Sequence, residues 1–384
     1  FVNVSAPSEI YTLSLHDALP ISLAVDETAT GTGLLGAGFH DETQWDVRLS
    51  VKHEALCFVN ALLGDEYYLK YYQQEYEDFA PLFTPEVSKA IENLKTVRRI
   101  TGMIMSANMT YLFSVNDDES LAGLLGDISD SREVFRSHKE LGSLDFLTEI
   151  LYTLFIKKNL KTLIEFLDMN NFEDYWERVT FPDLERRKAE LEEYLKSVNV
   201  VPVIERHLGF PLNSNRIRVY LLHFNKPHGI KLVGTQFITG QAYSEETIIR
   251  HAIHEMMHPP ADFNDREFKK AINTLRNDEL FMYYLKNHDR AYGYNNYRAF
   301  FEENCVDALE IFIAEKLGLP VVPGEFFKDH DGGMDVLGAA LYVAMKEEDF
   351  GSGDESFEDF LKRMLISRLA PGKIEGAYRE LTGN

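Results

Sequence analysis

The residues best suited to catalysis lie in SEETIIRHAIHEMMHPP, residues 244–260, where His254, Glu255 and His258 follow the pattern H-E-x-x-H. In a helix, imidazoles four positions apart lie on one face and can both reach a single Zn²⁺ at about 2.0–2.1 Å. The intervening Glu projects beside the metal, where it can take a proton from water. The composition of the chain predicts only about 0.06 chance matches to this pattern, so we interpret it as a site for one zinc ion.

The segment also carries the signals of a helix that starts and ends within it. Ser244 can cap the first turn, and Glu245 and Glu246 place negative charge at the positive end of the helix dipole. Pro259 and Pro260 mark the end of the helix. The sequence therefore predicts a helix with one apolar face and one face that carries the histidines.

A second H-E pair, in VKHEALC at residues 51–57, leads to a different interpretation. His53 and Glu54 are followed by Cys57, which gives H-E-x-x-C, but the surrounding residues are apolar. A small hydrophobic thiol packs well in a core. We predict a packed helix here and no metal site.

A catalytic zinc usually has three protein ligands and leaves a fourth position for water. YRAFFEENCVDALEIFIAEKLG, residues 297–318, predicts a long apolar helix on which Glu303, Asp307 and Glu310 share one face. A Glu ligand followed by an Asp one turn later suits a zinc site, because the Asp can accept the free ring N–H of a ligating His. Glu303 is the only glutamate on this helix with an aspartate four positions later.

The two motifs HEMMH and ENCVD together resemble the gluzincin clan of zinc metallopeptidases, whose pattern is H-E-x-x-H, a variable spacer and E-x-x-x-D on a second helix. The resemblance implies His254, His258 and Glu303 as ligands of one Zn²⁺, with Glu255 as the general base. It implies Asp307 as the residue that orients a ligand. The expected activity is hydrolysis of peptide bonds through a zinc-activated water, with a peptide or protein as substrate.

A competing resemblance concerns the third ligand. HDRAYGYNNY, residues 288–297, is similar to the Asp-plus-YGY segment of aspzincins, which would make Asp289 the ligand. Aspzincins have a much shorter spacing after the second His, so we favour Glu303. The spacer between His258 and Glu303 is longer than in the compact thermolysin-like gluzincins, which leaves the subfamily open.

Two segments before the H-E-x-x-H helix predict strands. RIRVYLLH, residues 216–223, and IKLVGTQFIT, residues 230–239, are rich in β-formers and are separated by the turn-like FNKPHG. The resemblance implies an antiparallel edge strand beside the active-site helix, where an extended substrate can add as a further strand.

Hydrolysis also requires a donor to the oxyanion of the transition state. The aromatic segment before the Glu303 helix supplies the candidates, of which we choose Tyr294 as the catalytic residue. The full set is Tyr292, Tyr294, Tyr297 and His288.

Repeated helical patterns fill residues 42–200, and the strands and the site follow in residues 201–384. We therefore predict an α+β fold with a helical domain at 42–200 and a zincin-like catalytic domain at 201–384 that contains a small antiparallel sheet. The formal charge of −23 argues against nucleic acid or an anionic membrane as partner. No apolar run reaches the roughly 18 residues of a membrane span.

The N-terminal residues stand apart from this fold. Residues 9–21, EIYTLSLHDALPI, match the direct translation of a widely used sequencing adapter, and the chain begins with Phe1. We interpret residues 1–22 as an assembly artefact and predict neither compartment nor oligomeric state. Two other functional classes stay open: a catalytically inactive zinc-binding protein and a non-peptidase zinc amidohydrolase.

Overall fold

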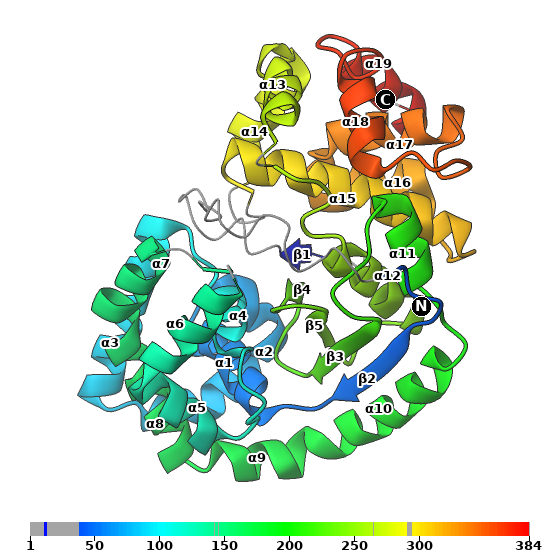
Figure 1. Ribbon diagram of the computed structural model, residues 1–384. Coiled ribbons are helices and arrows are strands. Elements are labelled where there is room, and N and C mark those ends of the chain that lie inside the picture. Colours follow the sequence, from blue (N-terminus) through cyan, green and yellow to red (C-terminus); the bar gives the residue numbers. More distant parts are fainter. Residues whose placement is uncertain are drawn as a thin grey trace, which may run out of the picture.

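The computed structural model describes residues 38–141, 143–144, 146–263, 265–289 and 294–383, and the backbone of one short strand at 11–13. The other residues of 1–22, interpreted above as an artefact, and Tyr292 lie outside this part of the chain. The fold is mixed α+β and mostly helical, with one small sheet at its centre (Figure 1).

The first part of the chain is helical, in agreement with the patterns of residues 42–200. Its helices pack on one side of the sheet in Figure 1, and α9 and α10 pass below it. They are α1 (Val51–Leu62), α2 (Glu66–Phe79), α3 (Pro85–Thr101), α4 (Met105–Phe113), α5 (Leu121–Ser129), α6 (Ser131–Glu140), α7 (Phe146–Leu151), the π-turn η3 (Tyr152–Ile156), α8 (Lys157–Met169), α9 (Phe172–Val179) and α10 (Phe181–Leu195).

The sheet has the order β1-β4-β5-β3-β2. Its strands are β1 (Tyr11–Leu13), β2 (Gln44–Arg48), β3 (Arg216–Leu222), β4 (His228–Lys231) and β5 (Gln236–Gly240). The prediction of an antiparallel sheet is wrong, because β2, β3 and β5 run parallel and β1 runs parallel to β4. Among the five strands that the structure describes, β4 and β5 are the one antiparallel pair.

The mostly parallel arrangement arises from two features that local sequence patterns do not reveal. The stretch 230–239 is not one strand, because the backbone turns at Gly234, whose φ of +67° suits glycine, and folds back as the β4–β5 hairpin. Residues 44–48 then join from far away in the sequence and extend the sheet beside β3.

The VKHEALC motif forms the start of the buried helix α1, as predicted. Both oxygens of Glu54 accept backbone N–H groups at the end of β3, from His223 at 2.7 Å and from Phe224 at 2.9 Å. Burial raises the pKa of the Cys57 thiol well above its usual value. The motif therefore packs α1 against the sheet.

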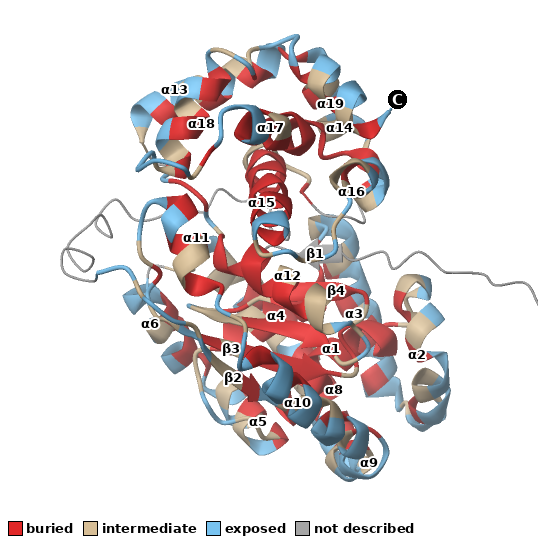
Figure 2. Cartoon of the chain, turned by 90° about the vertical axis from the view of Figure 1, so that its right-hand side faces the viewer, coloured by how far each residue is buried: buried red, intermediate tan, exposed pale blue. Residues whose placement is uncertain are grey.

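The second part of the chain is also mostly helical. They are α11 (Val201–Leu208), α12 (Glu245–Met256), α13 (Arg266–Asn273), α14 (Glu279–Asn287), α15 (Tyr297–Lys316), α16 (Pro323–Asp329), α17 (Val336–Glu347), α18 (Phe357–Leu365) and α19 (Ile374–Thr382), with the 3₁₀ turns η4 (Thr274–Asn277) and η6 (His330–Gly333). Helix α15 is buried along most of its length (Figure 2).

Helix α12 lies between the sheet and α15, which it contacts directly. Its start is confirmed at Ser244, whose hydroxyl oxygen accepts the N–H of Thr247 at 3.2 Å. The predicted second helix is confirmed as α15, and the chain leaves it through Gly318, with φ +73°. The H-E-x-x-H helix and the acidic helix are thus neighbours.

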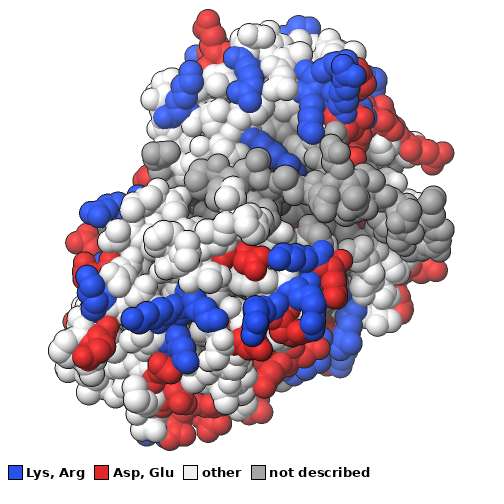
Figure 3. Space-filling view, turned by 60° about the vertical axis from the view of Figure 1, so that its left-hand side comes forward, with Lys and Arg blue, Asp and Glu red and all other residues white. Residues whose placement is uncertain are grey.

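The buried side chains of both parts of the chain belong to one hydrophobic core, which runs from Val47 to Tyr378. The boundary near residue 200 remains a prediction. Within the described residues, no helix is both long and apolar enough to cross a membrane. On the face shown in Figure 3, basic side chains lie beside acidic ones.

Candidate metal centre

Three side chains converge where the end of α12 meets α15. His254 Nε2 lies 3.0 Å from His258 Nε2 and 3.3 Å from Glu303 Oε1, and His258 Nε2 lies 3.6 Å from Glu303 Oε2. A tetrahedral ion with bonds of about 2.0–2.1 Å holds its ligand atoms about 3.3 Å apart. Because the three side chains are at most 3% exposed, the spacing and burial of these atoms fit one metal ion.

The charges around the two imidazoles favour a cation between them. Two ring nitrogens that face each other at 3.0 Å repel through their lone pairs unless a proton or a metal lies between them. Burial alone would lower the pKa of His254, but Glu303 and Glu310 outweigh it and raise that pKa well above its usual value. The same carboxylates would stabilise a bound metal ion.

The other ring nitrogen of His254 has a clear partner that the sequence did not identify. His254 Nδ1 donates to Glu310 Oε2 at 3.0 Å, whereas Asp307 Oδ1, the expected acceptor, lies 3.5 Å away. Arg250 holds Glu310 from the far side, with Nε at 2.7 Å and Nη2 at 2.6 Å from Oε1. Glu310 therefore orients the first histidine, and Asp307 is the more distant of the two carboxylates.

The second histidine is oriented by the neighbour of the candidate ligand. His258 lies two residues beyond the end of α12, and its Nδ1 donates to Glu302 Oε1 at 3.2 Å. The two consecutive glutamates of α15 thus contact the two sides of one imidazole ring. The sequence shows the adjacent pair Glu302–Glu303. Nothing in its spacing indicated that one glutamate would orient His258 while the other would be the candidate ligand.

We expect Glu310→Gln to weaken binding of the first zinc equivalent about 10–100-fold, the usual effect of changing the group that hydrogen-bonds a ligating His. The amide keeps the shape but removes the negative charge that balances Arg250 and polarises the ring. Competition with a chelator measures the affinity. Glu315→Gln, on the same helix but bonded to Tyr342 and Lys346, is the matched control. If Asp307→Asn lowered zinc affinity more than Glu310→Gln, Asp307 would be the residue that orients His254.

Glu255 lies beside the three atoms but is not among them. Neither of its carboxylate oxygens has a hydrogen-bond partner, and the side chain is fully buried. Strand β4 covers it so closely that a Cβ at Gly229 would lie 3.2 Å from Oε1. Burial raises its pKa to about 8, against the opposing effects of His254 and Lys231. A carboxylate of this kind accepts a proton readily near neutral pH.

Among the candidates for the oxyanion donor, Tyr294 lies next to the three converging ligand atoms. Its buried hydroxyl donates to Glu303 Oε1 at 2.6 Å, so it contacts the candidate ligand itself. Tyr297 donates instead to the carbonyl oxygen of Ile272 at 2.6 Å, and His288 Nδ1 donates to the carbonyl oxygen of its helical neighbour Tyr284. The role of Tyr294 in catalysis remains a prediction.

Asp289, the alternative third ligand, is exposed and follows α14. Among the described residues, three clusters of atoms are close enough to share an ion; one of them contains Glu303, and none contains Asp289. His251, one turn before His254, pairs its Nδ1 with the hydroxyl of Thr239 at 2.9 Å. The exposed position of Asp289, outside the three clusters, favours Glu303 as the third ligand.

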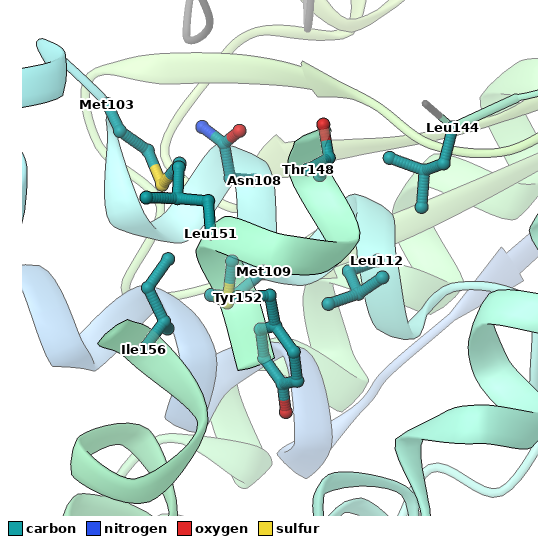
Figure 4. A pocket seen from close by; sticks show the side chains of 9 residues that line it. All are labelled: Met103, Asn108, Met109, Leu112, Leu144, Thr148, Leu151, Tyr152 and Ile156. Atoms are coloured by element: carbon teal, nitrogen blue, oxygen red, sulfur yellow. The ribbon is translucent and has the colours of Figure 1, made fainter. Parts of the chain in front are cut away.

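A separate cavity between α4 and α7 does not qualify as a ligand site. Figure 4 shows its lining, in which Met, Leu and Ile side chains surround Asn108 and Tyr152. Its volume of about 10 Å³ is close to the minimum for a single water molecule.

Comparison of the chain with models of known protein families, with curated proteins and with solved structures finds no match.

Proposed function

We propose that this chain is a zinc-dependent peptidase of the gluzincin type. The observation that carries the proposal is the convergence of His254, His258 and Glu303 within 3.0–3.6 Å, with the buried carboxylate of Glu255 beside them and outside the ligand set. Three ligands and a separate base are the parts that zinc-assisted hydrolysis requires.

When bound at these three residues, zinc supplies a Lewis acid that lowers the pKa of water towards 7 and polarises a carbonyl group. Glu255 accepts the proton of the attacking water and passes it to the leaving amine. Burial raises the pKa of this carboxyl group, which strengthens it as a base towards the attacking water, whereas a cation at the three ligands favours its deprotonated form.

Other residues of the chain hold these groups in place. Glu310 and Glu302 fix the ring orientations of the two histidines, and the hydroxyl of Tyr294 fixes Glu303. Hydrogen bonds of this kind to the ligands set their basicity as well as their direction. A preorganised site lowers the barrier because little rearrangement is needed during the reaction.

The strand beside the site, β4, supports a peptide as the substrate. Strand β4 packs against α12, and its Gly229 lies over Glu255. The backbone at 11–13, which we interpret as part of an artefact, pairs with β4 in parallel, so an extended peptide would take the place of this segment on the outer side of β4. An extended peptide bound in this way passes close to the general base.

A cleavage assay on the zinc-loaded chain tests the proposal. We expect hydrolysis of an unfolded protein such as casein, or of a peptide library, that a chelator abolishes and added Zn²⁺ restores. Bound zinc without cleavage of any peptide would instead support an inactive zinc-binding protein. Cleavage restricted to small non-peptide amides would support an amidohydrolase.

A further inference from the structure

A second group of possible ligands lies on the side of α15 that faces the loop before α17. Asp307 of α15, His330 of η6 and Asp335 each offer one atom, and these atoms all lie within 4.8 Å of one another. His330 Nδ1 lies 3.3 Å from Asp335 Oδ2. The carboxylates are fully buried and the imidazole is 8% exposed.

Asp307 is the residue that points to a ligand in this group. It is 0% exposed, and no donor group bonds either of its oxygens; its neighbour there is the carboxyl group of Asp335. The nearest imidazole nitrogen, Nδ1 of His254 at 3.5 Å, already donates to Glu310 at 3.0 Å. Glu310, and not Asp307, orients the ring of His254. The carboxylate of Asp307 is therefore available to bind another group.

The second group is also held in a defined geometry. Asn304 donates to Asp335 Oδ1 at 3.3 Å, and the ring of Phe326 stacks on His330 with centroids 4.4 Å apart. Asp331 follows His330 with a φ of +44°, and both of its buried carboxylate oxygens lack a hydrogen-bond partner. The loop therefore keeps one further carboxylate, that of Asp331, in the interior beside the group.

Buried carboxyl groups outnumber basic side chains around α15. The buried carboxyl groups in this region are those of Glu255, Glu302, Glu303, Asp307, Glu310, Asp331 and Asp335. The cationic side chains that the described residues bring near them are Arg250, Lys231, His254 and His330. Burial raises the pKa of Glu255, Asp307, Asp331 and Asp335, so these carboxyl groups hold protons unless a cation lies beside them.

We propose that Asp307, His330 and Asp335 bind a second divalent transition-metal ion. Two carboxylates and one imidazole suit Zn²⁺, Mn²⁺, Fe²⁺ or Co²⁺, whereas Ca²⁺ and Mg²⁺ prefer sets made of oxygen alone. The site does not depend on peptidase activity, because it uses none of His254, His258 and Glu303.

Counting metal in the full chain tests this site. The chain is stripped with a chelator, dialysed against excess ZnCl₂ and then against metal-free buffer, and its zinc is measured by mass spectrometry. We expect about two equivalents in the unaltered chain, one in Asp335→Asn and one in His258→Ala. Asp329→Asn, an exposed aspartate one position before the loop, is the matched control and should keep two.

The two metal sites give distinguishable failures. One equivalent in the unaltered chain that persists in Asp335→Asn and disappears in His258→Ala would overturn the second site, and protons would then neutralise its carboxylates. One equivalent that disappears only in Asp335→Asn would support the second site and refute the zinc site of the proposed peptidase. Melting curves of the stripped proteins check that each variant folds, and His330→Gln replaces Asp335→Asn if the latter does not.

Discussion

Glu255→Gln is expected to keep nearly stoichiometric zinc at the histidines and to lose at least about a hundredfold in the rate of peptide hydrolysis, the scale of a missing general base. Zinc is retained because neither oxygen of Glu255 belongs to the three converging ligand atoms. The rate falls because an amide of the same shape cannot accept the proton of the attacking water.

Metal analysis and a peptide assay on the same sample separate the two effects. Glu246→Gln, in the first turn of the same helix, is the matched control, because its carboxylate faces Tyr194 at the surface and should affect neither measurement. If Glu255→Gln lost its zinc, Glu255 would be a ligand and the assignment of roles in the site would be wrong.

Glu303→Ala is expected to weaken zinc binding by more than the roughly 10–100-fold that follows loss of a group hydrogen-bonded to a ligand. It removes one of three ligands, and with it the negative charge that both histidines face at 3.3 and 3.6 Å. Glu303→Gln, which preserves the volume of the side chain, separates this loss from the effect of a cavity in the core. Chelator competition measures both variants.

Asp289→Ala is the comparison that decides between the two resemblances. Asp289 is exposed and outside the candidate clusters, so its removal should leave zinc affinity unchanged. The opposite pattern, in which Asp289→Ala loses zinc and Glu303→Ala keeps it, would make Asp289 the ligand. The acidic face of α15 would then need another explanation.

The sequence was sufficient for those features that depend on spacing within one helix. The cap at Ser244 and the acidic helix appear as expected, and Glu303 faces both histidines, but α12 ends at Met256, so His258 lies just after the helix that was predicted to carry it. The orienting residues were not predictable in this way. Whether Glu310 or Asp307 is nearer to His254 depends on the relative rotation of α12 and α15 about their axes. The sequence of either helix alone does not determine that rotation.

The sheet shows the same limit of local patterns. β-forming residues marked the strands, but the direction of each strand depends on which partner it meets. The pairing of β2 with β3 joins residues that are far apart in the sequence, Gln44 with Arg216 at one end, and no window around either strand contains that information.

The position of the candidate ligands on two separate elements links metal binding to folding. His254 lies in the last turn of α12, His258 lies two residues beyond that helix, and Glu303 belongs to α15, so an ion shared by them cross-links two segments that are far apart in the unfolded chain. An ion that binds only the folded state adds RT ln(1 + [L]/Kd) to stability, about 2.7 kcal/mol at a hundred times Kd. On the proposed zinc site, removal of the ion would therefore lower the free energy of unfolding as well as any activity.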